Sequence, residues 1–143
     1  MATQTSNYFK EMLAKKVIDF VNDTFKIALM EAGFVFSRAS HQVFADVVAQ
    51  ELPTAYGYTA GGATLAGVSV VNDGALALCR ITWSNVSWTA AGGNIQAAAA
   101  IIYDDTVVAP GIDPIVGCID FGSSILTYNG GVLTIANPTV AIR

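Results

Sequence analysis

Few residues in this chain have the types and the spacing that catalysis requires. His41 is the single histidine, and neither a GxSxG turn nor a Cys–His pattern supplies a nucleophile for it to activate. It follows Ser40, a residue type that caps helices, in a segment that also contains Gln42 and Asp46. A histidine in such a setting is far more often a surface or capping residue than a general base. We therefore expect no catalytic role for His41.

Paired carboxylates are the second chemical possibility, because glycosidases use two of them. The candidate pairs are Asp104 with Asp105, and Asp113 with Asp120. Acidic residues beside Thr and Pro are more typical of turns, in which the carboxylate accepts nearby backbone N–H groups. The sequence therefore predicts a protein that is not an enzyme and has no catalytic residues.

The sequence also lacks the patterns that hold metals and cofactors. The Asn-Asp-Gly turn at 72–74 does not have the ligand spacing of an EF-hand. The glycine pairs at 61–62 and 92–93 do not form a phosphate-binding loop. Cys79 and Cys118 lie in strand-like runs without metal-ligand spacing, and we interpret both as small core residues. We expect no metal and no other cofactor.

Aromatic side chains offer one binding possibility, a platform for a sugar ring. In a β-rich chain, however, such side chains more often fill the core or a subunit interface. The candidates are Trp83, Trp88, Tyr56, Tyr58 and Tyr103.

Composition limits the class of protein. The chain has 143 residues, of which 53% are hydrophobic and 13% charged, and its net charge is −4. This length corresponds to one domain, residues 1–143. We expect neither nucleic acid nor membrane as a partner, because there is no basic field and no apolar run of the roughly 20 residues that span a bilayer. The polar N-terminus predicts synthesis in the cytoplasm, and the shortage of charge predicts that a partner covers part of the surface.

Alternating apolar residues and turn signals predict the elements that position these side chains. Strands are expected at 17–21, 25–29, 68–71, 76–83, 86–88, 95–103, 115–121, 125–128, 132–136 and 140–142. The four alanines at 97–100 would also suit a helix, but the following Ile-Ile-Tyr favours a strand. Hairpin turns are expected at 72–74 and 129–131. The pattern predicts a mainly β, single-domain antiparallel β-sandwich or barrel, with a short N-terminal helix or arm and one further short helix between Ser40 and Pro53.

The N-terminal segment is the expected place of partner contact. Ser6 or Asn7 is a suitable N-cap, and four apolar side chains then recur at helical spacing. One hypothesis makes residues 1–16 a docking arm whose apolar side chains contact a partner. The alternative is that these side chains cover the chain's own core. The four residues are Tyr8, Phe9, Met12 and Leu13.

Several stretches together resemble one family. They are DTFKIALM at 23–30, GYTAGGATLAGV at 57–68 and WSNVSWTAAGG at 83–93, extended by AIIYDDT at 100–106 and GCIDFG at 117–122. In this order and spacing they are similar to small virion proteins of tailed bacteriophages, of the capsid decoration, or cement, type. The likeness covers about residues 24–136.

This resemblance implies a structural role. A decoration protein binds the major capsid protein on the outer surface of the phage head and stabilises the shell, and it does so as a homo-oligomer, with a trimer expected at three-fold sites. The implied location is therefore the outer capsid surface of the virion. The alternative that the resemblance leaves open is a tail or fibre component that helps to recognise the host surface.

Overall fold

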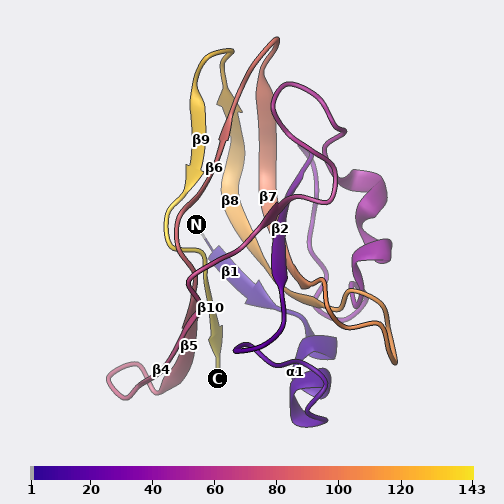
Figure 1. The fold of residues 1–143 in the computed structure, drawn as a ribbon, viewed down its shortest axis with the longest axis vertical. Coiled ribbons are helices and arrows are strands. Elements are labelled where there is room, and N and C mark those ends of the chain that lie inside the picture. The colour runs from indigo at the N-terminus through magenta and orange to yellow at the C-terminus, as the bar shows by residue number, and fades with distance from the viewer. Residues whose placement is uncertain (1) are drawn as a thin grey trace.

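The computed structural model describes residues 2–143, and it is mainly β with antiparallel sheets packed on one another (Figure 1). This confirms the predicted fold class. Its helical elements are α1 (Asn7–Ala14) and the 3-10 turns η1 (Phe44–Asp46) and η2 (Val48–Gln50). Its strands are β1 (Ala2–Thr5), β2 (Phe25–Met30), β3 (Ala63–Thr64), β4 (Ser69–Asp73), β5 (Leu78–Thr82), β6 (Val86–Thr89), β7 (Ile95–Asp104), β8 (Ile115–Thr127), β9 (Val132–Ile135) and β10 (Thr139–Ile142).

The first layer is a five-stranded sheet in the order β1-β8-β7-β2-β3. Strand β7 lies at its centre and pairs with β2, from Asp104 opposite Phe25 to Ala99 opposite Met30. The alanine run is therefore part of a strand, as predicted. Both faces of β7 are covered, so its sequence is apolar almost throughout rather than alternating.

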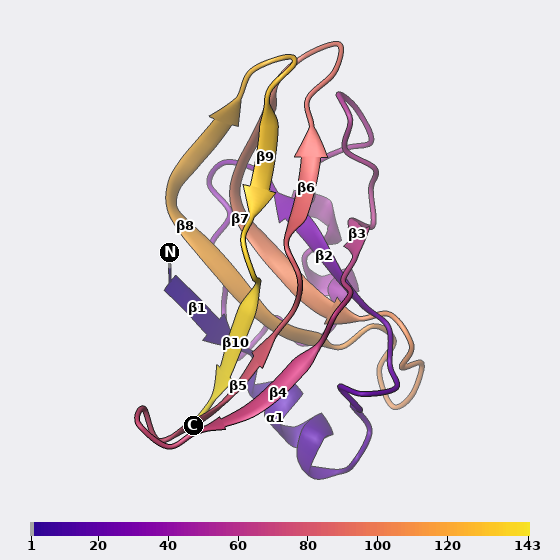
Figure 2. The ribbon, with the colours of Figure 1, turned by 60° about the vertical axis from the view of Figure 1, so that its left-hand side comes forward.

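The second layer is a long two-stranded ribbon with a third strand at one end. Strands β5 and β6 follow one another along one side, and β9 and β10 follow along the other (Figure 2). The two halves are joined where Trp83 N–H donates to the carbonyl of Pro138 at 3.0 Å and Asn137 N–H donates to Asn85 Oδ1 at 2.9 Å. Strand β4 pairs with β5 at the edge of this layer, which confirms a β4–β5 hairpin. Its turn lies at 74–77 and not at the predicted 72–74, because Asn72 and Asp73 are still paired with Cys79 and Leu78 of β5.

Aromatic side chains fill the space between the layers. The rings of Phe20 and Phe25 stack with their centroids 5.1 Å apart, and Phe25 lies 5.6 Å from Trp83. Helix α1 adds Phe9, whose ring meets the edge of Phe20 at 5.7 Å. A Phe-to-Ala change in such a core costs about 3–5 kcal/mol, so the helix is a structural part of the sandwich.

A second, smaller core lies on the opposite face of the large sheet. The segment from 31 to 52, which includes η1 and η2, crosses this face in Figure 1. Its Phe44 ring stacks on Tyr103 of β7 at 4.2 Å. Successive side chains of β2 point to opposite faces of the sheet, so Ile27 packs into the main core and Ala28 into the second core.

The run at 17–21 is not a strand, contrary to the prediction. The Asp19 carboxylate accepts the backbone N–H groups of Val21 at 2.9 Å and Asn22 at 3.3 Å, and it also accepts the Asn22 side-chain amide at 2.7 Å. These local hydrogen bonds satisfy the backbone without a sheet partner. Ile18 and Phe20 are still buried, so the apolar pattern reflects core contacts made from a turn.

The turn at 129–131 does not close a hairpin, which is a second correction. Strand β8 ends beside β7, with Thr127 opposite Ile95, whereas β9 pairs with β6. The connection therefore crosses from one layer to the other. It is held by the β6–β7 connection, because Asn129 Oδ1 accepts the N–H of Gly92 at 3.0 Å and Asn129 N–H donates to Asn94 Oδ1 at 2.9 Å.

The expected short helix before Pro53 consists of η1 and η2 rather than one α-helix. Ser40 does not cap it. The cap is the carboxylate of Asp46, which accepts the N–H groups of Gln42 at 2.9 Å and Val43 at 3.1 Å. No helix in the part of the chain that the structure describes has the length and apolar character to cross a membrane.

Candidate interaction surface

The N-terminal segment is integrated into the fold. Strand β1 extends the large sheet by pairing with β8, from Ala2 opposite Asp120 to Thr5 opposite Gly117. In α1, Phe9 and Met12 are fully buried in the main core. Met1 lies outside the described residues. Residues 2–14 therefore do not form a separate docking arm.

The four expected partner contacts divide accordingly. Phe9 and Met12 fill the chain's own core, which corrects their assignment as contact residues in favour of the stated alternative. Tyr8 and Leu13 are half-buried and pack against that core. A partner that meets the intact fold reaches only the outward parts of these last two side chains.

His41 has a structural environment. Its Nδ1 accepts the backbone N–H of Ser37 at 3.1 Å, and its ring lies against Phe34 and Phe36. Its backbone carbonyl accepts the Ser6 hydroxyl at 3.1 Å. Ser6 precedes α1 as the N-cap residue, but its hydroxyl is used for this contact and not for the helix N–H groups. The histidine thus anchors the start of α1 to the loop that covers the second core.

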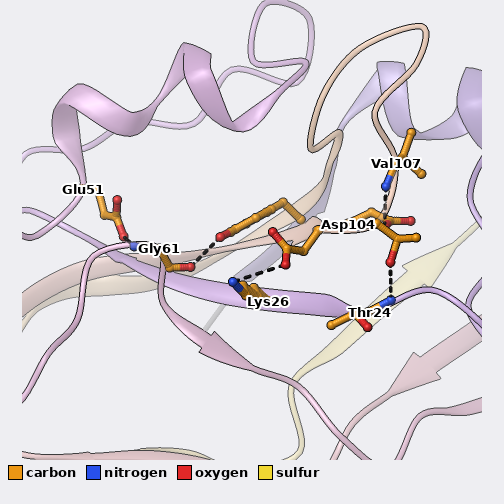
Figure 3. Close-up of polar contacts among 9 residues, drawn as sticks. Thr24, Lys26, Glu51, Gly61, Asp104 and Val107 are labelled. Atoms are coloured by element: carbon orange, nitrogen blue, oxygen red, sulfur yellow. Dashed lines mark hydrogen bonds and ion pairs between the residues drawn. The ribbon is translucent and has the colours of Figure 1, made fainter.

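Asp104 and Asp105 form a turn, as their neighbours suggested, and face different surroundings. Asp104 is completely buried, and its Oδ1 accepts the N–H groups of Thr106 at 2.9 Å and Val107 at 3.4 Å (Figure 3). Asp105 forms an ion pair with Lys26 at 3.2 Å. The two carboxylates thus have separate structural partners.

The protonation of Asp104 is unusual. Burial raises its pKa to about 7, and the neighbouring carboxyl of Asp23 contributes further. The second oxygen, Oδ2, is buried and has no donor among the described residues. It therefore needs a proton of its own to form a hydrogen bond with Asp23. Asp104 is consequently a buried acid that favours its neutral form.

The second carboxylate pair has local roles as well. Asp120 Oδ1 accepts the N–H of Gly122 at 2.8 Å. Burial, followed by the charge of Asp105, raises the pKa of Asp113. Among residues 2–143, no three His, Cys, Asp or Glu side chains gather in a way that would hold a metal ion.

Most of the aromatic platform candidates are core residues. Trp83, Trp88, Tyr58 and Tyr103 are buried. The two tyrosine hydroxyls belong to a network around Glu51, whose carboxylate accepts the Tyr58 O–H at 2.6 Å and the N–H of Gly61 at 2.5 Å. Tyr103 O–H donates to the carbonyl of Gly61 at 2.5 Å. Figure 3 shows how Glu51 and Gly61 approach each other above β2. Burial raises the pKa of both tyrosines.

Tyr56 alone among the five is exposed, with 51% of its surface accessible. It stands at the rim of a cavity of about 350 Å³ that Asn94 and Gln96 also line. Its ring lies directly against the backbone of Gly93, where a Cβ would overlap it. This fixed, exposed ring is the part of the chain that fits the sugar-platform hypothesis.

The β4–β5 hairpin carries several exposed apolar side chains close together. We call its exposed apolar side chains the hairpin surface: Val68, Val70, Val71 and Leu76. Adjacent residues of a strand face opposite sides, yet Val70 is 49% and Val71 52% exposed, and Leu76 at the tip is 59% exposed. Figure 2 shows the tip of the hairpin projecting sideways, to the left, at the end of the molecule where α1 lies. Strand β4 therefore buries neither face well.

The outer edge of β4 is also unprotected. It has no strand partner besides β5 among the described residues. Natural edge strands are usually blocked by lysine, proline or a bulge, but the sequence of β4 is Ser-Val-Val-Asn-Asp. Its single charge, Asp73, is paired with Arg80 of β5. A strand edge with exposed valines and free backbone groups is a template for another strand.

Sequence reasoning missed the hairpin surface. The signal available was the adjacency of Val70 and Val71, which cannot both face a core from one strand. That both are about half exposed could not be read from the pattern, because it depends on how closely β4 approaches the rest of the fold.

No protein-family model, curated protein or solved structure matches the chain.

Proposed function

We propose that this chain is a structural protein of a tailed-bacteriophage virion, a decoration protein that binds the outer head lattice and stabilises the shell. The resemblance over 23–30, 57–68 and 83–93 supports the family. The hairpin surface is the observation that carries the proposal. An exposed, unblocked apolar edge is a liability for a free monomer, and it becomes useful when a partner strand covers it.

The hairpin surface suits contacts that are weak singly and numerous in sum. Fully burying a valine contributes about 1.5–3 kcal/mol, so Val70 and Val71, each about half exposed, would gain roughly 1 kcal/mol apiece. Backbone hydrogen bonds along β4 would add to this through strand addition. A lattice multiplies such modest contacts because each copy is held at several places at once.

A ring of identical copies is the arrangement we propose, with a trimer as the expected size. Head-to-tail contacts in a ring need two different surfaces on each copy. The second surface is the outer edge of β8. Strand β1 covers that edge only from Gly117 to Asp120, so the part from Phe121 to Thr127 is open among the described residues. The hairpin of one copy would then pair with β8 of the next, and the ring would sit on the major capsid protein.

A binding assay with phage heads tests this proposal. The heads come from the phage that encodes this chain, after deletion of the gene for the chain. The purified chain should co-sediment with these heads at a fixed number of copies per head. The test variant is Val71→Glu, because Val71 lies opposite Arg80 in the β4–β5 ladder and the new carboxylate has a cation beside it. We expect this variant to fold and to bind at least tenfold more weakly.

The matched control is Val35→Glu, which adds the same charge at a valine that is 78% exposed and lies outside the hairpin. Its binding should equal that of the unmodified chain. Equal binding by Val71→Glu, or binding of the unmodified chain to tails or host envelope and not to heads, would contradict the proposal.

A further inference from the structure

Most cations without an ion-pair partner gather at one place in this acidic chain. Of the seven Lys and Arg residues, three form ion pairs: Lys15 with Glu11, Lys26 with Asp105 and Arg80 with Asp73. The four others have no such partner among the described residues. Three of these line a single cavity of about 190 Å³: Lys10, Arg38 and Arg143.

The cavity lies where α1, β1 and the end of β10 meet. Figure 2 shows β1 beside β10 at this place. The other lining residues are polar or small, and no acidic residue is among them: Thr3, Gln4, Thr5 and Ala141. Three cationic side chains with no acidic side chain among the lining residues repel one another, and the repulsion is relieved when an anion enters. The hydroxyl and amide groups of the walls add hydrogen-bond donors.

Arg38 is held in place for such a role. Its Nε–H donates to the carbonyl of Thr5 at 3.1 Å, and its own backbone carbonyl accepts the N–H of Asn7 at 3.0 Å. These contacts fix the guanidinium on β1 while using only one of its five N–H donors. The terminal amino groups are free for a second acceptor, and a planar guanidinium binds carboxylates and phosphates with two parallel hydrogen bonds.

We propose that this cavity binds a single oxyanion, either a phosphate or a carboxylate group. Its volume of about 190 Å³ is below the roughly 300 Å³ at which drug-sized sites begin, so it suits a small anion. Arg38 supplies the fixed donor, and Lys10 and Arg143 complete the positive wall. The proposal concerns the chain itself and does not depend on its role in a virion.

Isothermal titration of the full chain with sodium phosphate, and separately with sodium acetate, at constant ionic strength tests this site. We expect one anion to bind per chain. Removing one charge-assisted contact should weaken binding about tenfold or more, so Lys10→Gln and Arg143→Gln should both show this loss. Lys16→Gln is the matched control, because it removes the same charge from the fourth unpaired cation, outside the cavity.

The two titrations distinguish the sources of the oxyanion. Saturable binding of phosphate or of acetate supports the site and identifies the preferred group. Absence of binding to both, or an equal loss in Lys16→Gln, would overturn the proposal. If a variant fails to fold, NMR of the unmodified chain tests the same site. The side-chain N–H signals of Arg38 and Arg143 should shift together as phosphate or acetate is added. Unchanged signals would refute the site.

Discussion

Replacing Asp104 by Asn should make the chain more stable at neutral pH and remove part of its pH dependence. The native carboxyl is buried, and its pKa is raised to about 7 by burial and by Asp23. Asn keeps an Oδ1 that accepts the N–H groups of Thr106 and Val107. Its amide can donate to the Asp23 carboxylate without titrating. The variant therefore preserves the turn and removes the buried charge.

The magnitude follows from linkage. An unfolded Asp ionises near 3.8 and the folded one near 7, so between these values the unfolded state releases its proton first. The free energy of unfolding of the unmodified chain then falls as the pH rises, by about 1.4 kcal/mol per pH unit. Below this window the contribution vanishes, and above it the full cost remains. The stability advantage of Asp104→Asn should therefore grow by about 2 kcal/mol between pH 5 and 7 and level off above pH 7.

Urea unfolding followed by tryptophan fluorescence, repeated across this pH range at one protein concentration, measures the difference between the two proteins. Asp120→Asn is the control, because that carboxylate accepts a backbone N–H in the same way from an exposed position. It measures the effect of replacing a turn carboxylate that is not buried. A difference for Asp104→Asn that does not change with pH, or a variant that is less stable at neutral pH, would refute the account of this buried acid.

Three further predictions concern the core and its polar contacts. Phe9→Ala should lower the free energy of unfolding by about 3–5 kcal/mol in a urea titration, because the side chain is fully buried; a loss below 1 kcal/mol would instead indicate a detachable arm. Glu51→Ala should cost roughly 2–4 kcal/mol, since the carboxylate accepts two hydrogen bonds, from Tyr58 and Gly61, and Glu51→Gln should lose less. Burial raises the pKa of Cys118 to about 12, so a thiol reagent near pH 8 should modify it only after denaturation; rapid labelling in the native state would contradict its placement.

The sequence predicted the elements whose patterns are local. The strand through the alanines of β7 and the pairing of β4 with β5 follow from residue type and turn chemistry, although the turn itself lies two residues later than predicted. The run at 17–21 was misread because apolar β-branched residues can also reach a core from a turn, as Ile18 does here. The turn at 129–131 has the composition of a hairpin, but the side chains that fix it come from the β6–β7 connection.

The candidate sites depended on long-range placement, which local patterns do not contain. The apolar face of 6–16 is the same whether it covers a core or docks on a partner. Phe9 and Met12 are interior because α1 packs against β8 and the aromatic side chains of the main core, an arrangement that the local sequence does not reveal. The cations at 10, 38 and 143 come from three distant segments with no common spacing, so no motif could have joined them.

Gold-labelled antibody against this chain, applied to intact virions of the phage that encodes it and scored by electron microscopy, tests the proposed function most directly. The proposal predicts dense, regular labelling over the head. Virions that lack the chain should also have heads that burst more readily on heating. Labelling confined to the tail tube or tail tip, or no labelling of the virion, would contradict a head-decoration role.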